Sequence, residues 1–253
     1  MLFSFFVRLL IRSKSYLASV GVLYLFLLIG AYEDLGVEVH ALSIFEVSNM
    51  VGVAILLRPL IAALPVSFFL MREWGSKYYQ MILMRGSCLQ YSLSKSVAVF
   101  IVGFSVPLLA NLLLFITILV ISPAQIFNLS YPTSGGVFPN LVNNGHANLA
   151  LLLYILWYSL AGGIWAVMNL GVSLLTTNGY VLVSAPFLLE RVFSYIIQAS
   201  SRTKPFLNYL DSSQGYALRH KNGVLIHLLL CVFLCAFAAL SVHAATKRRL
   251  RHG

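Results

Sequence analysis

Six long, continuous runs of apolar residues dominate this chain of 253 residues. A helix that spans the hydrocarbon core of a bilayer needs about 20 such residues, whereas a transmembrane barrel strand alternates apolar with polar positions. Only 9% of the residues are charged and 60% are hydrophobic, so the charge is too sparse to cover a soluble surface. The sequence therefore predicts an all-α polytopic membrane protein that forms one transmembrane domain over residues 1–253. The predicted spans are Ser15–Ala31, Met50–Met71, Ser96–Ile121, Ala147–Leu175, Tyr180–Gln198 and Val224–Ala244.

Basic residues gather at three places that six spans would bring to one side of the membrane. They precede the first predicted span, fill the connection between the second and third, and follow the last. These residues are Arg8, Arg12 and Lys14, then Arg72, Lys77, Arg85 and Lys95, and finally Lys247, Arg248, Arg249 and Arg251. Because Lys and Arg are enriched in cytoplasmic loops, the pattern predicts a multi-pass protein of the cell membrane with both termini in the cytoplasm. With six spans, residues 199–223 form an outer loop. This loop departs from the rule, because it holds four basic residues and one acidic residue.

The two ends of the first predicted span differ in character. Residues 1–14 are predicted to form a short amphipathic helix at the inner membrane interface, and the alternative is a ragged start to the span. The residues predicted to face lipid are Phe3, Phe6, Leu9 and Leu10. After the span, residues 32–49 carry acidic residues and no Lys or Arg, which is typical of an outer loop.

The connection between the second and third spans, residues 72–95, is rich in charge for a chain of this kind. Within it Trp74, Tyr78 and either Met81 or Ile82 recur at helical spacing, so one face of a helix would be apolar. Gly86 and the residue after it then interrupt the pattern. The segment therefore predicts an amphipathic helix in the cytoplasm, a tight turn, and the start of the third span.

At this segment the chain resembles the permease subunits of the type-2 ABC exporters. In that family the second span ends in a Glu, which is followed by a Gly and an amphipathic cytoplasmic helix. A short turn comes next, and then a Lys at the start of the third span. The residues that match this order are Glu73, Gly75, Arg85, Gly86, Ser87 and Lys95. One departure is Cys88, because that position is frequently basic in the family.

The resemblance implies a transport mechanism in which the cytoplasmic helix docks on a separate ABC ATPase. The permease would form a dimer with a second copy or a paralogue, and ATP would be bound by the partner subunit. This chain has no GxxxxGK[ST] phosphate loop, so it is expected to be no enzyme and to hold no cofactor or metal of its own. The implied substrate is a peptide, a drug or a lipid-like molecule, and the partners include membrane lipid but no nucleic acid. The residues implied in coupling to the ATPase are Glu73, Trp74, Gly75, Lys77, Tyr78, Arg85, Gly86, Ser87 and Lys95.

Two other functions are compatible with the sequence. The first is a polytopic membrane enzyme, which would need acid, base or metal ligands gathered at one depth. The second is a non-transporting immunity or scaffold protein with the same fold. For the basic residues of the 72–95 segment, a simpler role is to set topology and to contact lipid headgroups.

Three residues of the Asp, Glu, Lys and Arg types lie within predicted spans: Arg58, Glu190 and Arg191. Counted from the inner surface at about 1.5 Å per residue, Arg58 and Glu190 lie at roughly 20 and 17 Å depth. We therefore predict an ion pair between them, either as a gate or polar spot on a transport path or as a static contact. The alternative for Arg58 is a set of hydrogen bonds to backbone carbonyls freed by nearby prolines. Asn111, Asn169 and Ser159 are predicted to join helices.

Overall fold

The computed structural model describes residues 2–35, 40–50, 53–76, 87–123, 138–176, 178–200 and 223–252. Over these ranges the fold is all-α, and six of the helices are long and apolar enough to cross a membrane. The helices are α1 (Leu2–Ile11), α2 (Lys14–Ala31), α3 (Ala41–Met50), α4 (Val53–Gly75), α6 (Cys88–Ile121), α8 (Pro139–Asn143), α9 (Ala147–Val172), α10 (Gly179–Ser200) and α11 (Gly223–His252). The prediction of a polytopic helical membrane protein with six spans is confirmed.

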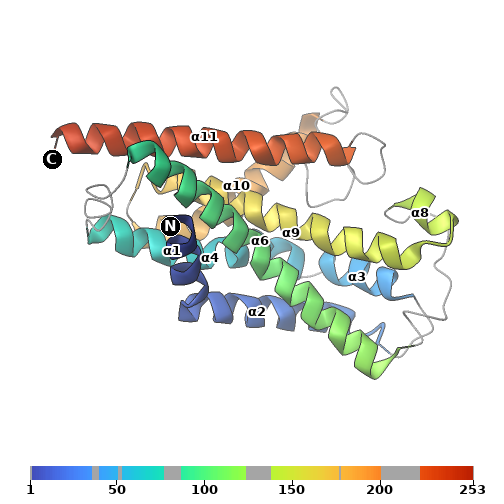
Figure 1. Cartoon of the computed structure of the whole chain (residues 1–253). Coiled ribbons are helices and arrows are strands. Elements are labelled where there is room, and N and C mark those ends of the chain that lie inside the picture. Colours follow the sequence, from blue (N-terminus) through green and yellow to red (C-terminus); the bar gives the residue numbers. More distant parts are fainter. Residues whose placement is uncertain are drawn as a thin grey trace.

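The six long helices follow one long axis, α1 lies across them, and both chain termini lie toward the same end of the bundle (Figure 1). That end holds α1, the last turn of α4, the first turn of α6 and the last turns of α11, while α3 and α8 lie toward the other end. We call it the basic end, because Arg8, Arg72 and Lys247 belong to these segments. The described parts of the three basic clusters are therefore on one side of the bundle, as six spans require.

The centre of the bundle is the contact between α6 and α9, where small residues let two backbones approach closely. A Cβ atom added at Gly103 would lie 2.3 Å from the Cβ of Ala166, and one added at Gly162 would lie 2.6 Å from the carbonyl oxygen of Gly103. Such small-residue contacts are typical of helices that pack within lipid, where the hydrophobic effect adds little.

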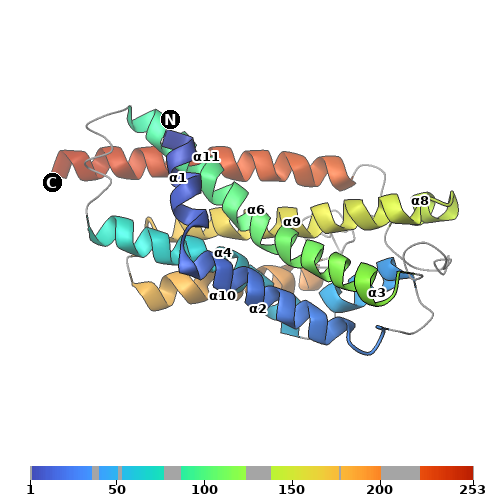
Figure 2. The ribbon, with the colours of Figure 1, turned by 60° about the horizontal axis from the view of Figure 1, so that its bottom comes forward.

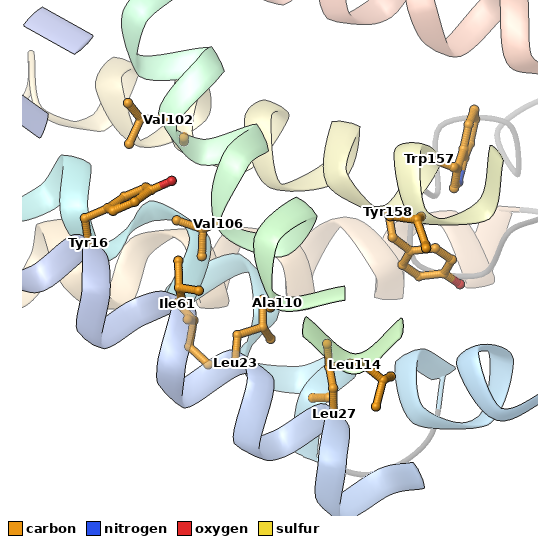
Figure 3. Close-up of a cluster of buried hydrophobic side chains, with 14 of the residues drawn as sticks. Tyr16, Leu23, Leu27, Ile61, Val102, Val106, Ala110, Leu114, Trp157 and Tyr158 are labelled. Atoms are coloured by element: carbon orange, nitrogen blue, oxygen red, sulfur yellow. The ribbon is translucent and has the colours of Figure 1, made fainter. Parts of the chain in front are cut away.

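Around this contact, α2 and α4 pack their apolar faces onto α6. Figure 3 shows Leu23 and Leu27 of α2 and Ile61 of α4 near Val106 and Ala110 of α6. All five side chains are buried. The outward faces of the spanning helices are apolar as well, with Leu17, Ile29 and Val120 among their most exposed side chains, as a surface against lipid requires.

The N-terminal segment is a separate short helix, which excludes a ragged start to the first span. Ser13 separates α1 from α2 as the N-cap of α2. Its hydroxyl accepts a hydrogen bond from the Tyr16 N–H at 3.2 Å. The predicted lipid face of α1 is half wrong. Phe6 and Leu10 are each 1% exposed and pack into the bundle, whereas Phe3 and Leu9 are each 40% exposed. The helix lies against α6, and that contact determines which face is covered.

Two boundaries differ from the sequence prediction. The helix that holds the third predicted span begins at Cys88, eight residues before the predicted start of the span at Ser96, and Tyr91, Ser92 and Lys95 of its first two turns are buried. The predicted outer loop at 32–49 contains α3, whose Phe45 and Leu42 are fully buried between α2 and α9. The predicted cytoplasmic helix lies mostly in residues 77–86, and the predicted last outer loop in residues 201–222, and both lie outside the described residues.

Candidate functional site

A buried cluster of three side chains joins the end of α4 to the beginning of α6 at the basic end. The Lys95 ammonium lies 2.5 Å from the Glu73 carboxylate, and the Tyr91 hydroxyl donates to the other carboxylate oxygen at 2.5 Å. Lys95 also donates to the Tyr91 hydroxyl at 3.1 Å. The three side chains are 0 to 3% exposed. We call these residues the Glu73 cluster.

Local sequence explains why these groups meet. Ser87 is the N-cap of α6, and its hydroxyl accepts from the Gln90 N–H at 3.2 Å, which starts the helix in the right register. Tyr91 and Lys95 are four residues apart, so they lie on the same face of α6. Glu73 occupies the last turn of α4 and points to that face, while its neighbour Arg72 is exposed.

Aromatic rings cover the cluster on the side of α1. The ring of Phe6 meets Tyr91 edge-on at 5.8 Å and Phe69 at 6.1 Å between centroids. The Lys95 ammonium lies 5.3 Å from the centre of the Tyr91 ring. Since water is excluded, each charge depends on its partner: a buried carboxylate or ammonium left alone would lose several kcal/mol of solvation.

The cluster links the two ends of the segment predicted to dock on an ATPase. Glu73 precedes residues 77–86 and Lys95 follows them. The ion pair between Glu73 and Lys95 therefore holds the two ends of this connection together. Of the predicted site residues, the structure brings Glu73 and Lys95 together and uses Ser87 as a helix cap. Trp74 and Gly75 belong to the last turn of α4, and the Trp74 side chain lies outside what the structure describes. Lys77, Tyr78, Arg85 and Gly86 also lie outside the described residues.

Sequence reasoning missed Tyr91, which belongs to the Glu73 cluster, and Phe6, which covers it. The signal for Tyr91 was present, because it lies one helical turn before Lys95 and on the same face. No pattern within the chain indicates that Phe6 reaches it, since that contact depends on how α1 folds back against α6.

A second buried polar group lies deeper in the bundle, around Arg58 of α4. Its guanidinium donates to the backbone carbonyl of Asn49 and, at 3.2 Å, to the Asn49 side-chain oxygen. The Asn49 amide donates in turn to the Asn111 side-chain oxygen of α6 at 3.0 Å. The guanidinium also lies 4.4 Å above the ring of Tyr158 of α9. Arg58 therefore fastens the C-terminal end of α3 into the bundle.

The predicted Arg58–Glu190 ion pair is wrong, because the structure gives each residue another partner. Glu190 accepts from Arg191 at 2.6 Å and from the Ser194 hydroxyl at 2.9 Å, all within α10. A backbone carbonyl and an amide at the end of α3 satisfy Arg58. The alternative prediction, in which Arg58 donates to a backbone carbonyl, agrees better with the structure. That carbonyl belongs to the end of α3, however, and not to a turn of α4 opened by a proline.

The predicted role of intramembrane amides as joints between helices is confirmed for two residues. Asn111 contacts α3, as above, and Asn169 of α9 donates to the Ser67 hydroxyl of α4 at 2.6 Å. Ser67 also donates to the Leu182 carbonyl of α10 at 3.1 Å, so one hydroxyl connects three helices. The Ser159 hydroxyl donates to the Ile155 carbonyl of its own helix at 2.7 Å, so this hydrogen bond does not join two helices.

Within the described ranges, no three His, Cys, Asp or Glu side chains gather as metal ligands would. Comparison with protein-family models, with curated proteins and with solved structures found no match to this chain. The likeness to ABC exporter permeases therefore depends on the motif residues and their order in this sequence.

Proposed function

We propose that this chain is the membrane permease subunit of an ATP-driven ABC exporter. In this proposal both termini and residues 72–95 lie in the cytoplasm of a cell-membrane protein. A separate nucleotide-binding subunit binds and hydrolyses ATP, and a second permease, identical or paralogous, completes the transporter. The substrate class is a peptide, a drug or a lipid-like molecule.

The observation that carries the proposal is the Glu73 cluster. A partner can shift a membrane protein between two states only through contacts that differ between those states. Residues 77–86 would provide such contacts, and the buried ion pair at their base ties them to α4 and α6 together. Force on this connection would therefore move two spans as one unit, and α6 packs most extensively on α9 at the bundle centre.

The test is capture of the partner from native membranes. A tagged chain extracted in mild detergent is expected to copurify with a subunit that carries a GxxxxGK[ST] loop and hydrolyses ATP. The variant Arg85→Glu reverses the charge at the turn that ends the proposed docking helix and is expected to lose that subunit. Lys247→Glu makes the same change at an exposed position of α11 at the basic end and is expected to keep it. A wild-type chain that brings down no ATPase contradicts the proposal.

Sidedness can be tested separately at Ser76, an exposed residue directly after α4. In a chain without its native cysteines, Ser76→Cys is expected to react with an impermeant maleimide in inside-out vesicles and not in intact cells. Labelling from outside intact cells would place the connection on the wrong side for a cytoplasmic ATPase.

A further inference from the structure

An open cavity of about 580 Å³ lies at the basic end, between the end of α1, the start of α2 and the C-terminal half of α4. Figure 2 shows α1 crossing the bundle at this level, with its C-terminal end at the beginning of α2 and beside α4. The cavity is separate from the Glu73 cluster, since none of the three cluster side chains lines it.

The rim of the cavity is positively charged. Arg12, Lys14 and Arg72 line it, and all three are exposed, so their charged groups are available to a ligand. Among the described residues that form the cavity there is no Asp or Glu. The cavity also lies at the N-terminal end of α2, where the helix dipole adds to the positive potential. This rim is suited to a phosphate, which Arg binds through two parallel hydrogen bonds.

The wall below the rim is apolar. Leu9 of α1 and Phe68 of α4 are 40% and 41% exposed, and Pro65 and Phe69 complete the surface beside them. A free phosphate would leave these side chains uncovered. A phosphate that carries an acyl chain would cover them, because the chain would extend along α4 toward the bundle centre.

A second, shallower hollow adjoins the first along α1. It shares Leu9 and Arg12 and adds Arg8 and Phe5, so the same alternation of cationic and apolar side chains continues. Basic hollows between helices near the membrane surface are typical sites for anionic lipid headgroups.

We propose that the cavity between α1, α2 and α4 is a binding site for an anionic glycerophospholipid. Arg12, Lys14 and Arg72 hold the headgroup phosphate, and an acyl chain lies on Phe68 and Leu9. This site is independent of the proposed ATPase coupling and needs only that the basic end lies at a membrane surface.

The experiment measures lipid retained by the purified full-length chain in detergent, by native mass spectrometry, after exposure to equal amounts of phosphatidylglycerol and phosphatidylcholine. The wild-type chain is expected to retain phosphatidylglycerol in preference. The variant Arg12→Gln/Arg72→Gln is expected to bind it roughly 30-fold more weakly, since each basic residue near the surface contributes about a factor of five. The control Lys247→Gln/Arg248→Gln removes the same charge from exposed residues of α11 and is expected to bind as the wild type does.

Three outcomes would overturn the proposal. Both lipids carry a phosphate, but only phosphatidylglycerol has a net negative charge. Equal retention of the two lipids by the wild type would therefore contradict a site that selects an anionic lipid, and this result requires no variant to fold. Equal loss in the cavity variant and the α11 control would show only a general effect of net charge. Displacement of the lipid by millimolar inorganic phosphate or glycerol 3-phosphate would assign the rim to a soluble phosphate instead.

Discussion

Removing one charge from the Glu73 cluster should be among the most damaging single changes in this protein. Lys95→Met deletes the ammonium from a position that is fully buried and leaves the Glu73 carboxylate with the hydrogen bond from the Tyr91 hydroxyl but no cation beside it. Breaking a buried ion pair in this way costs about 3–5 kcal/mol. Glu73→Gln is expected to cost a similar amount, because Lys95 then stays buried beside a neutral amide. Tyr91→Phe removes one hydrogen bond to a charged group and should cost about 1.5–3 kcal/mol.

The assay is the thermal midpoint of unfolding of the purified chain in one detergent. At about 2–4 °C per kcal/mol, Lys95→Met should lower the midpoint by about 10 °C. The double variant Glu73→Gln/Lys95→Met holds neither charge and should lose less stability than the two single variants together. The matched control Lys247→Met makes the same chemical change at an exposed position and should stay within about 0.5 kcal/mol of the wild type.

The reasoning is refuted if the two single losses simply add in the double variant, because residues that interact across a buried pair must show a coupling energy. It is also refuted if Lys95→Met and Lys247→Met shift the midpoint equally. In that case the ammonium of Lys95 would be solvated, and the cluster would not hold α4 to α6.

Three further predictions follow from other contacts and use the same thermal assay. Gly103→Ala places a Cβ 2.3 Å from a side chain of α9 and should cost about 1–3 kcal/mol, whereas Gly171→Ala meets nothing within 4 Å and should cost nothing; equal effects would contradict the close contact. Asn111→Ala removes a buried partner of the Asn49 amide and should cost about 1–3 kcal/mol, most of which should disappear in an Asn49→Ala background. Burial lowers the pKa of His40, whose neutral Nδ1 accepts a hydrogen bond at 3.1 Å from a backbone N–H two residues on. The resulting stability is present above the unfolded-state pKa of about 6.5 and is lost as the pH falls through the lower folded-state pKa. His40→Asn keeps an acceptor at this cap, so its thermal midpoint should fall less than that of the wild type between about pH 7.5 and about pH 5; parallel curves would argue against the mechanism.

The spans were predictable because length and hydropathy alone decide whether a helix can cross lipid. The ends of the spans were harder to predict, as α6 shows. Lys95 reads in the sequence as the point where a span enters the membrane, yet it is buried and α6 begins at Cys88. A charge marks the membrane surface only when it stays in water, and here Glu73 neutralises it within the protein.

The same limit explains α3, which occupies a stretch predicted as an outer loop. Glu33 and Asp34 made the connection look polar, but the apolar residues from Ala41 to Phe45 begin a helix of only ten residues, too short to register as a span. His40 at its start provides the cap, since its carbonyl accepts from the Ser43 N–H at 2.9 Å. Such a helix is stabilised by the surfaces that enclose it, and those surfaces come from distant parts of the chain.

Arg58 shows what a search for opposite charges leaves out. The depth estimate correctly placed Arg58 inside the bundle, but it compared Arg58 only with other ionisable residues and so chose Glu190. In lipid the free carbonyls at the end of a short buried helix are as much in need of a partner as an isolated cation is. Arg58 and the end of α3 satisfy each other, and Asn49 extends that contact to α6. One intramembrane cation thus explains why α3 can be buried at all, and the structure gives Glu190 its own partner one residue away.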